Sequence, residues 1–137
     1  MDDDQIVFLR RAQEFPQNRI AMNMRVVLDE LRRSAKTGDS LTVVGGGGES
    51  MLWRQMYADI FGLTIRKTNI GQNAASLGAV ATAAVGAGLW PSFDRVAELL
   101  RIESESRPIS EYIPIYTESL ERFRRATGYL ADFALGR

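Results

Sequence analysis

The chain has 137 residues, which fits one domain, and 45% of them are hydrophobic, which is ordinary for a globular protein. Its 17 Lys and Arg residues balance 17 Asp and Glu residues, so the basic excess typical of nucleic-acid binders is missing. The absence of both Cys and His excludes thiolate nucleophiles, the Ser-His-Asp triad and most zinc sites.

The N-terminal region carries no targeting signal that we recognise. It opens Met-Asp-Asp-Asp, which is acidic where a secretory signal would be basic. The uncharged run 74–90 is too short and too rich in Ala and Gly to span a bilayer well. We therefore expect a cytoplasmic protein without a membrane partner. Residues 6–15 fit either a short helix or a strand, and Pro16 interrupts this element. We therefore expect an N-terminal extension over 1–16 and one domain over 17–137.

Residues 17–36 have the pattern of an amphipathic helix. Its apolar side chains share one face: Ile20, Met24, Val27, Leu28 and Leu31. The apolar run Leu41–Val44 predicts a buried strand, and four glycines, Gly45 to Gly48, follow it. Residues 49–61 predict a helix that Ser50 can cap and Gly62 ends.

The second half of the chain predicts one more strand and several helices. In chain order we expect a strand over 63–68, a turn over 69–73, an Ala- and Gly-rich helix over 74–88, a short helix over 93–100, an irregular polar segment over 103–108 and a long helix over 111–133. The apolar face of the last helix holds Tyr112, Tyr116, Leu120, Phe123 and Leu130. The strand–helix–strand order between 41 and 68 predicts a right-handed parallel unit.

The strand, glycine run and helix around Gly45 to Gly48 form the most informative pattern. Glycines permit positive φ angles and let a ligand lie against bare backbone, which suits a nucleotide. A flexible turn without a ligand is the alternative. A phosphate loop is excluded because Glu49-Ser50 follows the glycines, and the dinucleotide fingerprint fails at Ser50. Because Glu49 would repel phosphate, we expect the adenosine end of a nucleotide at the glycines.

Residues 45–59, Gly-Gly-Gly-Gly-Glu-Ser-Met-Leu-Trp-Arg-Gln-Met-Tyr-Ala-Asp, resemble the FGGY carbohydrate-kinase signature Gly-Gly-Gly-Ala-x-Ser-x-x-Trp-x-Gln-x-x-Ala-Asp, with Gly48 in place of Ala. Residues 75–79 and 83–89 resemble the family's next helix, and residues 20–25 resemble the preceding one. The closing helix is similar at Tyr112, Tyr116, Phe123 and Arg124. The blocks agree in order and spacing, and the xylulokinase-like branch is the most similar.

The resemblance implies an α/β fold: the helix-rich C-terminal lobe of the actin-like ATPase (ribonuclease H-like) fold, with a short strand–Gly loop–helix–strand unit. ATP lies between two lobes in such enzymes. The resemblance implies that Gly45, Gly46, Gly47 and Gly48, with Met51, contact the adenosine side of ATP. It implies no catalytic or metal-binding residue in this chain. We interpret Trp53, Gln55 and Asp59 as structural residues.

The family's Asp-x-Gly-Thr phosphate loop, sugar-binding residues and Asp base have no counterpart here, and the resemblance fails upstream of about residue 18. In the complete enzyme the γ-phosphate of Mg-ATP passes to a sugar hydroxyl, and that step needs Mg²⁺ and a base. We therefore expect no turnover from this chain alone, whether it is a truncated product, a split-gene subunit or an excised domain. Two strands make a poorly covered sheet, so we expect self-association or pairing with a separate N-terminal lobe.

Two other functions fit parts of the sequence. A non-catalytic oligomerisation or regulatory remnant of a sugar kinase would keep the fold and lose ATP. An unrelated dinucleotide-binding domain is disfavoured by Ser50, which stands where the fingerprint needs its third glycine. The sequence does not indicate the sugar, because substrate contacts in this family come mainly from the other lobe.

Overall fold

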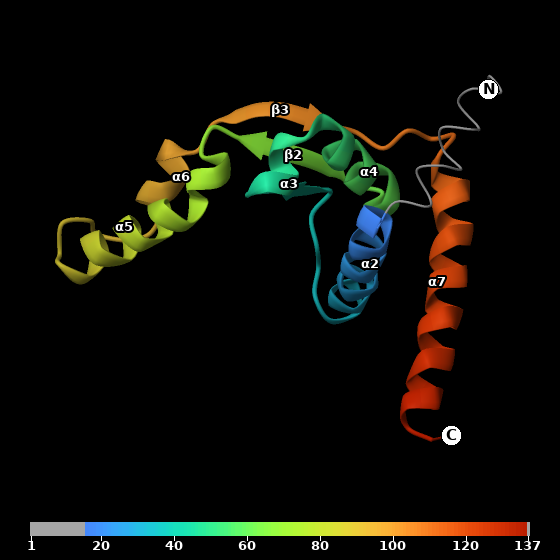
Figure 1. Cartoon of the computed structure of the whole chain (residues 1–137). Coiled ribbons are helices and arrows are strands. Elements are labelled where there is room, and N and C mark those ends of the chain that lie inside the picture. Colours follow the sequence, from blue (N-terminus) through green and yellow to red (C-terminus); the bar gives the residue numbers. More distant parts are fainter. Residues whose placement is uncertain (1–15, 137) are drawn as a thin grey trace. The chain divides into compact units, whose positions relative to one another are not determined.

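The computed structural model describes residues 16–136, so the undecided element over 6–15 lies outside the described residues. The described residues form two compact units, one comprising 16–37, 59–62 and 108–136 (unit 1) and one comprising 38–58 and 63–107 (unit 2). The elements, labelled in Figure 1 where there is room, are α2 (Pro16–Ser34), β1 (Ser40–Thr42), α3 (Gly46–Glu49), α4 (Met51–Phe61), β2 (Thr64–Thr68), the 3₁₀ turn η1 (Gly71–Asn73), α5 (Ala74–Gly86), α6 (Arg95–Leu99), β3 (Ile102–Ser106) and α7 (Ile113–Ala134).

Unit 2 is built on the pairing of β1 with β2. The two strands are parallel, with Leu41 opposite Ile65, which confirms the parallel arrangement expected from the strand–helix–strand order. The amide of Val43 donates to the carbonyl of Arg66 at 3.0 Å, which continues the pairing just beyond β1. Ile65 is fully buried and forms the centre of this unit's core.

The expectation of an irregular segment over 103–108 is wrong, because residues 102–106 form strand β3, antiparallel to β2. The sheet therefore has three strands in the order β1-β2-β3 (Figure 1). Cross-strand ion pairs hold β3 in place: Arg66 lies 2.9 Å from Glu105, and Lys67 lies 3.3 Å from Glu103. The hydrogen bond from Arg66 holds the pKa of Glu105 below its usual value. Opposite charges facing each other across two strands stabilise the pairing without an apolar pattern.

Helix α2 begins at Pro16 among the described residues. The first helical position needs no amide hydrogen, and the fixed φ of proline suits it. The predicted apolar face is wrong for most of its residues, because only Leu28 of that face is buried in unit 1. The helix buries Ala21 and Met22, which lie outside the predicted face, and about half of the surface of the other predicted side chains is exposed. These exposed residues are Ile20, Met24, Val27 and Leu31.

The long helix α7 is covered along its first half only. Tyr116 and Leu120 are buried, as the predicted apolar face requires, whereas Leu130 is 68% exposed. Burial raises the pKa of Tyr116 to about 12, and the nearby charge of Asp59 adds to this effect. In the part of the chain that the structure describes, no helix is both long and apolar enough to cross a membrane.

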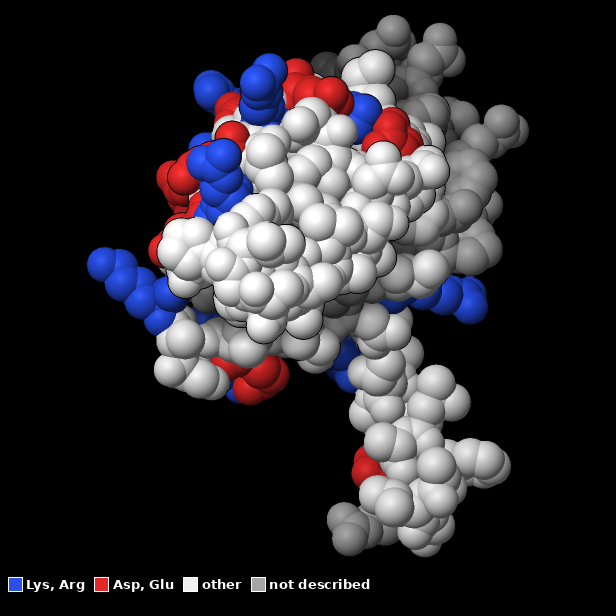
Figure 2. Space-filling view, turned by 90° about the vertical axis from the view of Figure 1, so that its left-hand side faces the viewer, with Lys and Arg blue, Asp and Glu red and all other residues white. Residues whose placement is uncertain are grey.

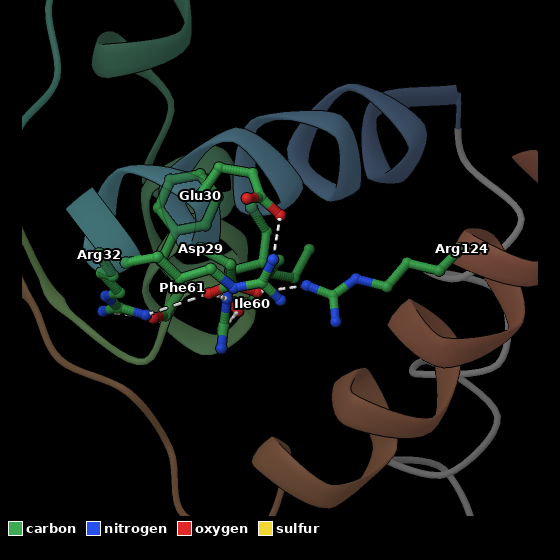
Figure 3. Close-up of polar contacts among 8 residues, drawn as sticks. Asp29, Glu30, Arg32, Ile60, Phe61 and Arg124 are labelled. Atoms are coloured by element: carbon green, nitrogen blue, oxygen red, sulfur yellow. Dashed lines mark hydrogen bonds and ion pairs between the residues drawn. The ribbon is translucent and has the colours of Figure 1, made fainter.

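A single carboxylate, that of Asp29, joins α2 to α7 in unit 1 (Figure 3). Its two oxygens accept hydrogen bonds from Arg25 Nε at 2.8 Å and from Arg124 Nη2 at 2.6 Å. Arg32 Nη1 lies 3.5 Å from the first of these oxygens. Partial burial alone would raise the pKa of Asp29, but the hydrogen bond and charge of Arg25, with those of Arg124, outweigh burial and lower it.

The arginines around Asp29 also cap the end of α4. Arg25 donates to the carbonyl of Ile60. Arg32 Nη2 donates to the carbonyl of Phe61 at 3.3 Å (Figure 3). The last carbonyls of a helix have no partner within the helix, and cations there interact favourably with its dipole. Asp29 thus orients the side chains that complete α4.

Replacing Asp29 by Asn should lower the free energy of unfolding at pH 7 by about 1–3 kcal/mol, because the arginines lose their shared acceptor charge. The pKa of Asp29 is lowered in the folded state. The contribution of Asp29 to the free energy of unfolding is therefore fully present above the unfolded-state pKa of about 3.9, and it is lost as the pH falls through the folded-state pKa. Urea unfolding between pH 7 and pH 2 should therefore show a shallower loss of stability in D29N than in the wild type. E118Q, at an exposed position of α7, serves as the control, and parallel pH profiles for wild type and D29N would contradict the assignment.

Candidate functional site

The glycine turn, residues 45–48, lies at the carboxyl end of β1. Because β1 and β2 are parallel, this end lies beside the carboxyl end of β2, where residues 69–73 form the next turn. The amide of Gly45 donates to the carbonyl of Gly71 at 3.2 Å and joins the two turns. The crevice outside the carboxyl ends of parallel strands is the usual ligand site of open α/β sheets.

The backbone of the turn is unusual at its first residue and helical after it. Gly45 has φ 80° and ψ −171°, a region that side-chain-bearing residues rarely adopt. Residues 46–49 form the short helix α3, and Gly48 donates to the Gly45 carbonyl at 2.9 Å. The predicted helix over 49–61 therefore begins later, at Met51, after an extended Ser50.

Ser50 caps α4, as expected. Its Oγ accepts a hydrogen bond from the amide of Trp53 at 3.4 Å. The cap satisfies one of the free amides at the start of α4. It therefore fixes where α4 leaves the glycine turn.

The four glycines expose their α-carbons to different surroundings. A Cβ added to Gly45 or Gly46 would meet no atom within 4 Å. A Cβ on Gly47 would lie 3.5 Å from both Trp53 and Tyr57, and one on Gly48 would lie 2.9 Å from the carbonyl oxygen of Val43. The first half of the turn is thus open, and the second half is covered by the protein itself.

Trp53 and Tyr57 are the residues of α4 that cover Gly47. Their rings meet edge to face, with centroids 5.6 Å apart and planes inclined at 71°. Tyr57 is buried, and burial raises its pKa. Trp53 therefore packs against the turn, which agrees with our interpretation of it as a structural residue.

Gln55 and Asp59 also make structural contacts. Gln55 Nε2 donates to the carbonyl of Arg107 at 2.8 Å, and Asp59 Oδ1 accepts from the amide of Ile109 at 2.8 Å. These bonds tether the segment that connects β3 to α7. Met51 differs, because its side chain is 72% exposed at the start of α4.

Glu49 is paired with a cation. Its Oε2 lies 2.9 Å from Lys67 Nζ, which also lies 3.3 Å from Glu103. Hydrogen bonds to Glu49 and to Glu103 raise the pKa of Lys67. The Glu49 carboxylate also lies against Gly71, where a side chain would collide with it. The repulsion between Glu49 and phosphate expected from the sequence is therefore reduced by Lys67.

Unit 1 contains a separate pocket of about 210 Å³. Its polar lining includes Arg25 and Arg32, and both side chains already interact with Asp29 and with the carbonyls at the end of α4. Its apolar lining comes from α4 and α7, including Phe61 and Leu120. Among the described residues, no group of three or more acidic side chains could hold a metal ion.

The conformation of Gly45 leads to a matched pair of substitutions. G45A should lower the free energy of unfolding by about 1–3 kcal/mol, because alanine is strained at this φ and ψ. G46A should change it little or raise it slightly, because its Cβ meets open space and alanine favours the helix. Chemical denaturation of both variants measures the difference, and equal stabilities would show that Gly45 does not hold this conformation in solution.

Known proteins resemble this chain in sequence. The profile of the "FGGY family of carbohydrate kinases, C-terminal domain" matches residues 19–87. The chain is 36% identical over 92 residues to the autoinducer-2 kinases of Salmonella choleraesuis (strain SC-B67) and Salmonella typhimurium (strain LT2). The matches cover 66% of this chain but only 17% of those relatives.

Solved structures show the same fold. The xylulose kinase of Lactobacillus acidophilus has a TM-score of 0.70 at 20% identity, over 82% of this chain and 23% of that one. The gluconate kinase of the same organism has a TM-score of 0.72 at 20% identity, over 84% and 23%. The helix-rich α/β architecture with a small mixed sheet is that of the actin-like ATPase fold, which confirms the predicted fold class. The chain belongs to the FGGY family of carbohydrate kinases, and its residues 19–87 match the C-terminal domain of that family.

Proposed function

We propose that this chain provides the adenosine side of the ATP site of a carbohydrate kinase and that it transfers no phosphoryl group alone. The observation that supports this most is the pair of bare, open α-carbons at Gly45 and Gly46, at the carboxyl ends of two parallel strands. Bare backbone there lets a planar base or a ribose approach closely. The family match makes ATP the natural nucleotide.

The four glycines have different roles in this proposal. Gly45 and Gly46 contact the ligand, and Met51 adds an exposed apolar side chain nearby in sequence. Gly47 and Gly48 leave room for α4 and for the Val43 carbonyl, so they shape the turn. Glu49, held by Lys67, is placed where it could accept a hydrogen bond without carrying an unpaired charge.

Phosphoryl transfer would require catalytic groups in addition to those proposed for this chain. Phosphoryl transfer depends on positioning the γ-phosphate, on Mg²⁺ and on a base for the acceptor hydroxyl. The chain spans 17% of the length of the curated relatives it matches. We propose that the acceptor is a sugar or a similar alcohol. The relatives and structural neighbours are autoinducer-2, xylulose and gluconate kinases, so these three compounds are the first to test.

A large uncharged face of unit 2 suggests where the rest of a kinase would pack. Residues 68–93 contain no Asp, Glu, Lys or Arg. Figure 2 shows a broad uncharged surface on the side of α5 and α6. Val80 is 57% exposed and Leu89 is 77% exposed. Exposed apolar side chains on a broad uncharged surface are typical of an interface, so we propose that the rest of the kinase covers it.

Nucleotide binding should depend on the open half of the turn. Calorimetry should detect ATP and ADP but not NAD, with weak affinity because part of the cleft lies outside this chain. G46L should weaken ADP binding by about tenfold or more, since its side chain fills the space left for the ligand. G78L, at a glycine of α5 that is equally open, is the control. Absence of adenine-nucleotide binding would favour the non-catalytic remnant, and a preference for NAD would favour a dinucleotide-binding domain.

The chain alone should show no steady turnover with Mg-ATP and a panel of pentuloses, polyols, gluconate and autoinducer-2. Co-expression with an autoinducer-2 kinase fragment that lacks the matched region should give a complex, and kinase activity if the two parts fit. Light scattering of the isolated chain should show self-association through its uncovered face. Turnover by the isolated chain, or a clean monomer in light scattering, would contradict this part of the proposal.

A further inference from the structure

Arg54, on the first turns of α4, holds the closing half of the glycine turn. Its Nη1 donates to the carbonyl of Gly48 at 2.5 Å and to the carbonyl of Glu49 at 3.0 Å. The side chain reaches back from α4 across the extended residue Ser50 to the last carbonyls of α3. One nitrogen therefore bridges the two peptide groups at which the turn ends.

The surroundings of Arg54 are unusual for a cation. The residue is only 8% exposed, and its Nε is buried without a hydrogen-bond partner. No carboxylate in the described part of the chain lies within ion-pair distance of it. Buried charges are usually paired, and a buried donor without an acceptor is destabilising. Stability alone would favour an apolar side chain of similar size at this position.

A residue that lowers stability and lies next to a proposed ligand site suggests a functional role for that residue. The carbonyls that Arg54 binds belong to the same four-residue helix as Gly46. Gly48 also donates to the Gly45 carbonyl, so movement of Gly48 would be transmitted to the open half of the turn. Trp53 and Tyr57 limit the turn from the side of Gly47.

We propose that Arg54 is a positioning residue, whose guanidinium fixes the carbonyls of Gly48 and Glu49 so that Gly45 and Gly46 present a preformed surface to the nucleotide. This inference rests on the proposed adenosine site. Its structural half, that Arg54 orders the turn, is independent of any ligand. Preorganisation of this kind improves affinity because the free protein has less conformational freedom to lose on binding.

The test compares R54M, which keeps the apolar stem and removes the donors, with R54K, which keeps a charge and a single donating nitrogen. Amide hydrogen exchange followed by NMR should become about tenfold faster at Gly45 and Gly48 in R54M, with sheet amides such as that of Ile65 unchanged. R54K should exchange at rates between those of R54M and the wild type. R95M removes an exposed arginine of α6 in the same unit and should change none of these rates.

The binding arm uses ADP as the probe. R54M should weaken ADP binding by about tenfold with little change in the thermal midpoint, and R54K should restore part of the affinity. Unchanged exchange at Gly45 and Gly48 in folded R54M would overturn the proposal. So would a uniform rise in exchange across unit 2, or faster exchange in the turn with unaltered ADP affinity. If R54M does not fold, R54K decides between the same outcomes. Failure of the wild type to bind ADP would count against the proposed function, while the exchange measurement would still decide whether Arg54 orders the turn.

Discussion

The parallel pairing of β1 with β2 is the constraint on which the candidate site depends. It brings the carboxyl ends of both strands to one place, so that the amide of Gly45 can reach the carbonyl of Gly71. The same pairing positions Lys67, on β2, beside Glu49. If the strands ran antiparallel, the glycine turn would lie at the opposite end of β2, far from both partners. The positive φ of Gly45 then directs the chain from the strand into α3.

Helix α4 converts a run of identical residues into a turn with two distinct halves. Trp53 and Tyr57 pack over Gly47, and Arg54 holds the carbonyls of Gly48 and Glu49. Gly45 and Gly46 are left uncovered. The glycine run therefore has two roles here. It allows other parts of the protein to approach the backbone closely, and it leaves a surface on which another molecule can lie.

Much of this arrangement was predictable from the sequence, because long periodic helices and short apolar strands carry strong patterns. The helices over α2, α4 and α7, the parallel pairing of the two strands and the cap at Ser50 were all expected, and the structure confirms them. The burial expected for Leu41–Val44 is wrong, because β1 contains no fully buried residue and Val44 is 50% exposed. Strand β3 was missed because Ile102–Ser106 has charged residues and serines in place of an apolar pattern. Its signal was the match of Glu103 and Glu105 to the cations of β2, which can be recognised only once the pairing register is known.

The position of the glycine turn was predictable from the sequence, but the surroundings of its residues were not. The sequence marks four glycines as equivalent, and only the packing of α4 distinguishes Gly46, which is open, from Gly48, which is buried. Arg54 stands at a variable position of the family signature, so no motif drew attention to it. The apolar stripe of α2 is a further case, because periodicity shows that Ile20 and Val27 share a face but not what covers it.

The charges of β3 determine how this sheet can grow. β1 and β3 are the outer strands of the three, and each has one row of backbone groups that no strand of the sheet occupies. Charged side chains along β3 disfavour pairing with a further strand, which is a common protection against edge-to-edge aggregation. β1 carries no charged residue over Ser40–Thr42. Of the two outer strands, β1 thus carries no charge that would oppose a further strand, whereas β3 does.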